Sequence, residues 1–457
     1  MMRSLYSGVS GLQNHQTRMD VIGNNISNVN THGFKTSRAT FQDMLSQTIS
    51  GASRPEQTRG GINPRQVGLG MNIAAIDKIF TQGSLETTGN PTDLALTGDG
   101  FFIVAEGDNN FYTRAGAFGL DRDGTMVNPA NGMKVQGWMA RPDATGNMVI
   151  DSTGTIEDLI IPIYSKIEAR ETTDVRYQSN LDSRSPVVPD GATAGMRASA
   201  GVTTNIDIYD NQGNNHRMSM IFWKTGVNTW SASAAIAGSE GPVTLDVPAG
   251  AGQENQPNPN SRINLQFSPD GKLLSIADDA TPDQLNSGVL TVDVNFRIPG
   301  DPNVRNVTLN LGSAGVEDGI TQFASHSTTK AVEQNGYGMG YMESYDIDNS
   351  GIITGIYSNG TRRSIGQVAT AVFTNPQGLQ ASGNTMFEVS NNSGMPNIGP
   401  AAQEGRGNIT AGALEMSNVD LADQFTNMIV TQRGFQANSR SITTSDEMLQ
   451  ELLTLKR

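Results

Sequence analysis

Apolar residues recur every seven positions at both ends of the chain, and this spacing predicts one helix at each end. The turn-rich run NVNTHG at 28–33 ends the first predicted helix, whereas the second runs almost to Arg457. Each apolar stripe is narrow, because polar residues occupy most positions of the same helical face between the seven-residue repeats. The stripes consist of Leu5, Val9, Leu12, Met19 and Ile26 near the N-terminus and Leu421, Phe425, Met428, Phe435, Ile442, Leu449 and Leu453 near the C-terminus.

Most apolar stripes on helices are buried core faces, and that interpretation applies to either stripe taken alone. Two stripes at opposite termini of one chain instead favour helices that pair with each other and bury their remaining apolar surface against neighbouring copies. Ser417 or Asn418 is a candidate N-cap for the second helix, with Asp420 in its first turn.

Between the helices, short runs of β-forming residues alternate with turn sequences such as TGDG, DRDG and NPANG. The chain has 51 Gly and only 17% charged residues, which fits many tight turns between short strands. The predicted strands are Leu94–Leu96, Phe101–Ala105, Phe111–Arg114, Met133–Trp138, Ile206–Tyr209, Met218–Trp223, Thr229–Ala235, Val289–Val294, Val304–Leu311, Gly351–Tyr357, Ile365–Phe373 and Thr385–Val389.

The order of these segments predicts a nested, mainly β chain of several domains with α-helical termini that pair as a coiled-coil-like inner domain. Residues 1–31 and 418–457 would form the helical polymerisation domain, and residues 32–75 and 394–417 a connector. Residues 76–175 and 318–393 would form a β-rich domain, into which a second, outer β-domain is inserted at 176–317. The first connector is expected to be irregular, with one helical turn around Phe41, Met44 and Leu45.

Composition excludes several kinds of function. The net charge of −14 and the isoelectric point near 4.7 argue against a nucleic-acid partner, because phosphate binding requires clustered Lys and Arg. No cysteine is present, which excludes disulfides and thiol chemistry. The four histidines, His15, His32, His216 and His326, have no metal-ligand spacing. We therefore expect no cofactor, and composition gives no sign of an enzyme.

No run of apolar residues approaches the length of a membrane-spanning helix, and the N-terminus lacks the apolar core and small-residue site of a cleaved signal peptide. The chain is expected to be cytoplasmic, or exported with its N-terminus intact. The slight basic flanking of the first stripe argues against membrane binding.

One stretch, Asp346–Gly351, resembles the start of a calcium-binding EF-hand loop. Its twelfth position is Tyr357 rather than Glu, and no helices are predicted beside it, so a turn between strands is the better interpretation. The Gly-rich runs lack the GK[ST] ending of a phosphate-binding loop, and no G-x-S-x-G element is present.

Several motifs resemble those of the bacterial flagellar rod and hook (axial) protein family. NNISNVNTHGFK at Asn24–Lys35 is similar to its N-terminal signature, and SNVDL, QRGFQANS and DEML, which begin at 417, 432 and 446, are similar to its C-terminal one. The middle resembles hook members in particular, with TGDGFFIV, YTRAGAF, IYDNQGNNH, KTGVNTW and YSNGTRRSIGQVA. Matching signature residues are Asn24, Asn25, Asn28, Gly33, Phe34, Lys35, Asn418, Asp420, Gln432, Arg433, Asn438 and Ser439.

The resemblance implies a structural subunit of the flagellar hook, which polymerises into a flexible helical tube and transmits torque from rod to filament. It implies export through the flagellar export apparatus without a cleaved signal peptide, and an extracellular location in the hook and basal body. Implied partners are the chain itself, the distal rod protein, the hook cap and the hook–filament junction protein, with no nucleic acid and no membrane insertion.

Two alternatives stay open at this point. The terminal motifs do not separate hook from rod, so a distal rod subunit of the basal body is the first, although the inserted domain favours the hook. An enzyme or adhesin on a β-sandwich scaffold is the second. One departure from the family concerns Gly434, which stands inside the second helix where the family often has Ala and costs about 1 kcal/mol of helix stability.

Overall fold

The computed structural model describes residues 2–52, 54, 60–143, 148–189, 191–247, 261–278, 288–298, 303–328 and 330–454. The chain divides into two compact units. The first contains Met1–Ile163, Ser344–Ile356 and Arg362–Arg457, and the second contains Tyr164–Glu343 and Tyr357–Thr361. The finer four-part division that the sequence predicts stays a prediction.

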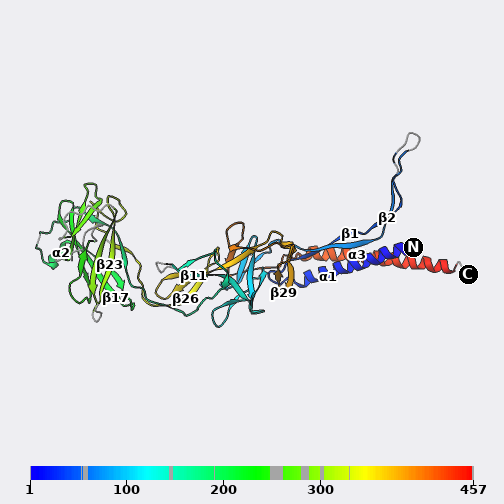
Figure 1. The fold of residues 1–457 in the computed structure, drawn as a ribbon, viewed down its shortest axis with the longest axis horizontal. Helices are drawn as coiled ribbons and strands as arrows, with labels where there is room; N and C mark the ends of the chain where they lie inside the picture. Colours follow the sequence, from blue (N-terminus) through cyan, green and yellow to red (C-terminus); the bar gives the residue numbers. More distant parts are fainter. Residues whose placement is uncertain are drawn as a thin grey trace. The chain divides into compact units, whose positions relative to one another are not determined.

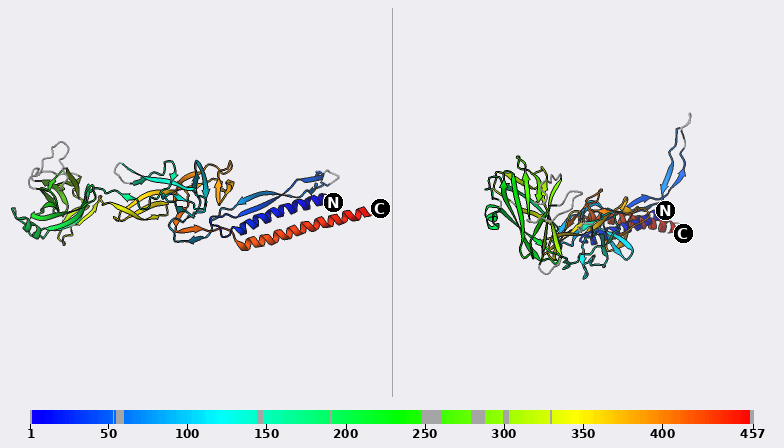
Figure 2. Two further views of the ribbon diagram at one scale, coloured as in Figure 1. Left: turned by 90° about the horizontal axis from the view of Figure 1, so that it is seen from below. Right: turned by 60° about the vertical axis from the view of Figure 1, so that its left-hand side comes forward.

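Both terminal helices are present in the first unit, as predicted. Helix α1 (Met2–Ser27) and helix α3 (Leu421–Thr454) lie side by side and antiparallel, with the start of α1 next to the last turns of α3 (Figures 1 and 2). The cap of α3 differs from the expected one. Asp420 Oδ1 accepts the N–H groups of Ala422 and Asp423 at 2.8 and 3.3 Å, so Asp420 is the N-cap.

The first connector is not irregular. Strand β1 (Ser37–Asp43) pairs antiparallel with β4 (Met71–Lys78), and β2 (Ser46–Ser50) pairs with β3 (Arg65–Gly68). The helical turn expected around Phe41, Met44 and Leu45 is wrong, because Phe41 lies within β1. Strand formation here depends on a partner segment further along the chain, in which Lys78 pairs with Ser37 and Met71 with Asp43, and local composition does not reveal it.

The rest of the first unit is a β-body. Its main sheet follows the order β27–β28–β11–β7–β8–β30–β29, with a core that includes Phe101, Ile103, Tyr112 and Trp138. Its strands are β5 (Leu85–Thr87), β6 (Leu94–Thr97), β7 (Phe101–Glu106), β8 (Asn109–Thr113), β9 (Gly119–Leu120), β10 (Met126–Val127), β11 (Lys134–Pro142), β12 (Met148–Ile150), β13 (Glu157–Asp158), β27 (Ile352–Tyr357), β28 (Arg362–Val372), β29 (Gln380–Gly383), β30 (Met386–Glu388), β31 (Asn397–Pro400), β32 (Asn408–Ala411) and β33 (Ala413–Glu415), with a 3-10 turn at Pro376–Gly378.

The stretch that resembles a calcium loop forms a turn that ends at the start of β27. Asp348 Oδ1 accepts the N–H groups of Ser350 and Ile352 at 2.8 and 2.9 Å. The carboxylate is thus used to close the turn, as the sequence predicted.

The second unit is a β-sandwich. One sheet has the order β19–β22–β23–β15–β24 with β25 beside β15, the other has the order β16–β17–β18–β20–β21, and both contribute to one apolar core. Its elements are β14 (Lys166–Ile167), β15 (Asp174–Asp182), α2 (Ala194–Ala200), β16 (Val202–Tyr209), β17 (Asn215–Gly226), β18 (Thr229–Ile236), β19 (Thr244–Asp246), β20 (Arg262–Phe267), β21 (Leu273–Asp278), β22 (Val289–Arg297), β23 (Val304–Ser313), β24 (Ile320–Phe323), β25 (Lys330–Gln334) and the start of β26 (Gly340–Ile347).

Strand β15 is not among the predicted strands, because its segment falls at the predicted domain boundary. Val175, Tyr177 and Leu181 point into the core in strict alternation with more exposed residues. That period of two is the signal which identifies a half-buried strand.

Candidate assembly site on the terminal helices

Small and polar side chains make most of the contact between α1 and α3. The contacting residues recur at intervals of three or four, as in a coiled coil. Ser4 Oγ lies 3.4 Å from Ser445 Oγ at one end, and Asn25 Nδ2 donates to Gln424 Oε1 over 3.1 Å at the other. This seam consists of Ser4, Gly8, Gly11, His15, Arg18, Ile22 and Asn25 on α1 and Gln424, Asn427, Thr431, Gly434, Asn438, Ile442 and Ser445 on α3.

Glycines allow the two helices to approach closely along the seam. A Cβ on Gly8 would lie 2.9 Å from Cγ1 of Ile442, and one on Gly11 would lie 2.4 Å from Nδ2 of Asn438. Side chains from α3 therefore fill the space that these glycines leave free on α1. The predicted pairing of the helices is confirmed, but the apolar stripes contribute only Ile442 to it.

His15 occupies the middle of the seam and connects three elements. A Cβ on Gly434 would lie 2.8 Å from Cε1 and Nε2 of His15, and the His15 ring meets the ring of Phe41 in β1 edge-on at 5.8 Å. Burial and the nearby Arg18 lower the pKa of His15. The neutral ring thus packs between α3 and the β1–β4 ribbon.

The predicted apolar stripes lie beside the seam. On both helices the stripe residues come one position after residues of the seam, as Leu5 comes after Ser4 and Met428 after Asn427. The stripe is therefore rotated from the seam by the same angle on each helix. Because the helices are antiparallel, equal offsets place both stripes on the same side of the pair. We call this surface the apolar face; it comprises Leu5, Val9, Leu12, Met19 and Ile26 of α1 and Leu421, Phe425, Met428, Phe435, Leu449 and Leu453 of α3, whereas Ile442 of the predicted stripe belongs to the seam.

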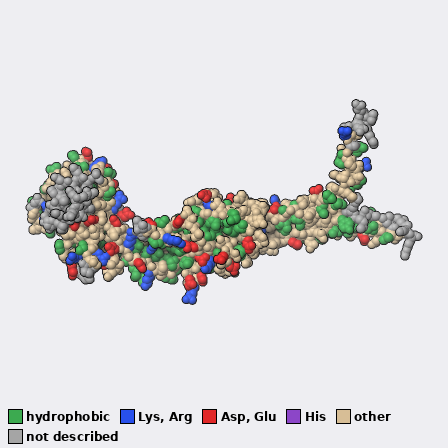
Figure 3. Space-filling view, in the orientation of Figure 1, with side chains coloured by type: hydrophobic (Ala, Val, Ile, Leu, Met, Phe, Trp, Pro, Cys, Tyr) green, Lys and Arg blue, Asp and Glu red, His purple; other side chains and the backbone are tan. Residues whose placement is uncertain are grey.

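Much of the apolar face is open in the single chain. Leu421, Phe425, Phe435 and Leu453 are 40%, 50%, 37% and 70% exposed, whereas the α1 members other than Val9 are half-buried. Figure 3 shows hydrophobic side chains at the surface of this helical part. The β1–β4 ribbon does not cover this face, because it contacts α1 on the other side of the seam, where Asn14 Nδ2 donates to the carbonyl of Met71 over 2.7 Å.

A buried ionic group joins the helices to the β-body. Glu415 Oε1 accepts from Lys35 Nζ at 2.6 Å, and its Oε2 lies 3.4 Å from Nη1 of Arg114; the three side chains are 0–3% exposed. Lys35 also donates to the carbonyl of Thr81 and Arg114 to that of Gly98, at 2.8 and 2.7 Å. Burial lowers the pKa of Lys35, although Glu415 opposes the effect.

Two signature asparagines complete this junction. Asn25 exchanges hydrogen bonds with the backbone N–H and carbonyl of Ser37, at 3.0 and 2.8 Å. Asn418 accepts from the N–H of Thr36 at 2.8 Å and donates to the carbonyl of Ile79 at 2.8 Å. Asn25, Lys35, Arg114, Glu415 and Asn418, here called the junction cluster, therefore fix where the chain leaves α1 and enters α3.

Four regions of the chain match models of flagellar protein families. Residues 5–35 match "Flagella basal body rod protein", and residues 95–157 match "Flagellar hook protein FlgE/F/G D1 domain". Residues 180–337 match "Flagellar basal body protein FlaE D2 domain", and residues 410–455 match "Flagellar basal body rod FlgEFG protein C-terminal". These matches include both helices and parts of both units.

Full-length relatives decide between hook and rod. The chain is 51% identical to the flagellar hook protein FlgE of Borreliella burgdorferi and 48% identical to that of Treponema pallidum, over 100% of each chain in both cases. It belongs to the flagellar hook protein family. Identity to the flagellar basal-body rod protein FlgG of Bacillus subtilis is 29%, again over 100% of both chains. Membership of the hook family makes this chain a structural protein of the flagellar hook and not an enzyme.

The fold agrees with this assignment. The crystal structure of a Helicobacter pylori flagellar hook protein, FlgE2, superimposes with a TM-score of 0.52 over 72% of this chain and 100% of that one, at 15% identity. None of the described helices is long and apolar enough to cross a membrane.

The signature residues of the axial-protein motifs lie in several different parts of the fold. Asn24 and Asn28 bond to each other at the end of α1, and Phe34 lies under the ammonium of Lys78. Asn438 belongs to the seam, whereas Gln432 and Arg433 are exposed and Ser439 is half-buried. Gly33 has φ +70°, and a Cβ there would lie 2.5 Å from the backbone nitrogen of Ala115, so only glycine fits.

Sequence reasoning missed the seam and two members of the junction cluster. Most seam residues are small or polar and so lie outside the apolar stripes, although Ser4, Gly8, Gly11 and His15 show the same three–four spacing. Neither Arg114, which lies in the YTRAGAF motif, nor Glu415 carried a local sign that the two would meet. They are 301 residues apart, and only the fold brings them together.

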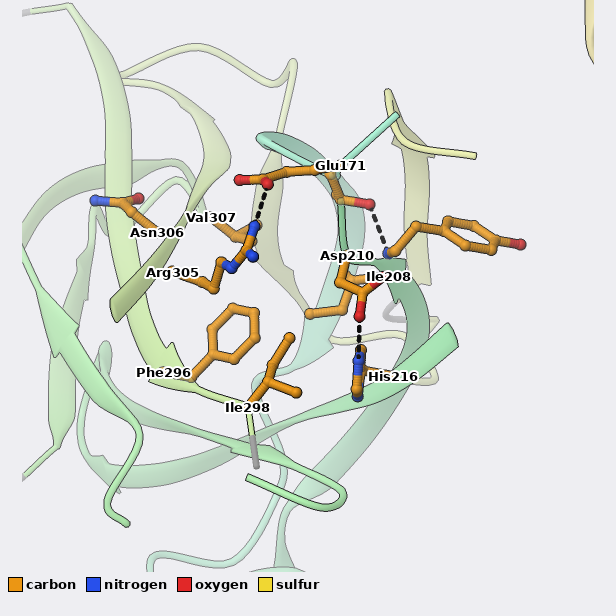
Figure 4. Close-up of a pocket in the computed structure, with 11 residues that line it drawn as sticks. Glu171, Ile208, Asp210, His216, Phe296, Ile298, Arg305, Asn306 and Val307 are labelled. Carbon is orange, nitrogen blue, oxygen red and sulfur yellow. Dashed lines mark hydrogen bonds and ion pairs between the residues drawn. The ribbon is translucent and has the colours of Figure 1, made fainter. Parts of the chain in front are cut away.

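A small pocket lies in the second unit (Figure 4), and four of the polar side chains that line it are paired with one another. Arg305 is paired with Glu171, and Asp210 Oδ2 lies 3.3 Å from Nε2 of His216. Burial opposes ionisation of Asp210, but hydrogen bonds from Asn214 and His216 outweigh it and lower the pKa of this carboxyl. The pairs close a turn and a strand end, which is a structural role.

Proposed function

We propose that this hook protein polymerises with copies of itself into a helical tube, and that the apolar face is the surface buried between copies. The observation that carries the proposal is the exposure of Leu421, Phe425, Phe435 and Leu453 on a helix whose own partner contacts it through small and polar residues. Burying each such side chain is worth about 1.5–3 kcal/mol relative to leaving it in water.

A second copy fits this face better than a membrane does. The helix pair presents two antiparallel apolar stripes separated by a polar seam, and such ridges can pack into the grooves of another helix pair. The sequence of α1 contains two basic residues, Arg3 and Arg18. A helix that binds an anionic membrane surface instead carries many Lys and Arg on its polar side.

Substitution on the apolar face tests the proposal. Phe425→Asp removes a half-exposed ring and adds a charge, so we expect assembly to be lost while the urea midpoint of the soluble chain stays within experimental error. Thr426→Asp adds the same charge at an exposed position one residue further around α3, and it should assemble normally. Sedimentation and electron microscopy measure assembly; normal tubes from the Phe425 variant would refute the role of this face.

We further propose that subunits leave the cell through the flagellar export apparatus with their N-terminus intact and assemble outside it beneath the hook cap. The tube would contact the distal rod protein at one end and the hook–filament junction protein at the other. Membership of the hook family supports this order. Mass spectrometry of assembled hooks should find the N-terminal peptide uncleaved, and a strain without an active export apparatus should retain the chain inside the cell. A shortened N-terminus would contradict export without cleavage.

A further inference from the structure

An open pocket of about 400 Å³ lies beside the junction cluster in the first unit. One wall is the loop after α1, with Asn28, Thr31 and Phe34, and the opposite wall is the turn between β29 and β30. Lys78, the last residue of β4, projects between these walls. Neither the apolar face nor the seam includes these residues, so the assembly role argued above does not account for them.

Lys78 is an unusual cation in this chain. Its Nζ lies 5.6 Å from the ring centroid of Phe34 and 5.4 Å from that of Phe387. Among the described residues it has no hydrogen bond to an oxygen and no carboxylate partner, whereas the neighbouring Lys35 is bound to Glu415. Two aromatic faces attract an ammonium but replace its lost water only partly. Burial accordingly lowers the pKa of Lys78.

The turn that forms the opposite wall is strained. Asn384 and Thr385 have φ +48° and +58°, and two positive φ values are what a two-residue β-hairpin turn requires. Glycine normally occupies the second position, because a β-branched residue is rarely left-handed. Residues held in such strained backbone conformations concentrate at binding sites. Here Asn384 adds an amide at the edge of the pocket, whereas the hydroxyl of Thr385 donates to the carbonyl of Asn384 over 2.6 Å.

We propose that this pocket receives an Asp or Glu side chain from a second copy of the chain in the hook polymer. A carboxylate would complete the coordination of the Lys78 ammonium and accept a hydrogen bond from the side-chain amide of Asn384. The chain has 45 acidic against 31 basic residues, so neighbouring copies offer a surplus of carboxylates. The inference rests on self-assembly as proposed above, and it assigns a specific electrostatic contact in addition to the apolar face.

Zero-length cross-linking identifies the partner directly. A carbodiimide joins an amine to a carboxylate only when the two are in contact. A mixture of isotope-labelled and unlabelled copies is assembled, treated and digested, and the Lys78 peptide is examined by mass spectrometry. We expect Lys78 joined to an acidic peptide of the other isotope in the polymer and not in the unassembled chain. Absence of such a product, or equal amounts in both samples, would overturn the proposal.

Matched variants measure the size of the effect. Lys78→Met keeps the aliphatic stem between the rings and removes the charge, so the critical concentration for assembly should rise about three- to tenfold, the range between exposed and partly buried ion pairs. Lys78→Arg keeps the positive charge, so its critical concentration should stay close to that of the wild type. Lys134→Met, which removes an exposed ion pair with Asp158, is the control. If the wild type assembles and Lys78→Met has the same critical concentration, the pocket proposal is refuted while self-assembly stands. If the wild type does not assemble, the proposal of self-assembly is itself refuted.

Discussion

The pairing of Gly434 with His15 gives a quantitative test of the seam. Replacement of Gly434 by Ala would by itself stabilise α3 by about 1 kcal/mol. Its Cβ would however lie 2.8 Å from two atoms of the His15 ring, which in turn is packed against Phe41. Displacing a packed ring of this kind costs about 1–3 kcal/mol. The steric cost should therefore exceed the gain, and Gly434→Ala should lower the free energy of unfolding by about 1 kcal/mol.

A double-mutant cycle separates the two effects. In the His15→Ala background the space above residue 434 is free, so the same Gly434→Ala change should raise the free energy of unfolding by about 1 kcal/mol. The expected coupling is about 2 kcal/mol, within the range for residues in contact. Urea unfolding followed by far-UV circular dichroism measures each corner. Gly23→Ala, on α1 with no atom within 4 Å of its Cβ, is the control and should be additive. Equal effects of Gly434→Ala in both backgrounds would refute the reasoning.

Three further outcomes follow from the structure. Glu415→Gln removes the carboxylate that two buried cations share and should cost about 3–5 kcal/mol of unfolding free energy, measured by urea denaturation. Gly33→Ala should cost at least about 2 kcal/mol, because φ is +70° and a backbone nitrogen lies 2.5 Å from the new Cβ, whereas Gly23→Ala should be stabilising. Hydrogen bonds from Arg184 lower the pKa of Asp182 from 3.8 to about 2, so its stabilising effect is present above pH 3.8 and lost as pH falls through 2; NMR titration should show this value, and Arg184→Ala should return it towards 3.8.

The local sequence pattern was sufficient to predict those parts of this protein whose structure depends on residues that are close together in the chain. The seven-residue spacing predicted both terminal helices, because a helix forms its hydrogen bonds within four residues. Turn sequences such as the one at Asp348–Gly351 were equally readable, since a carboxylate there caps its own backbone. The short motifs at 24–35 and 417–449 also indicated the flagellar axial family, because each motif is contained in one continuous stretch of the chain.

The tertiary structure alone decided which residues meet. The apolar stripes suggested the contact between the helices, yet the seam is built from Gly8, Gly11, His15 and their partners, because close approach requires small residues on one helix opposite larger ones on the other. Strand β1 and the ion group of Lys35, Arg114 and Glu415 depend on partners far away in the sequence. Such contacts are fixed by the path of the whole chain, and no local window of sequence contains both of their members.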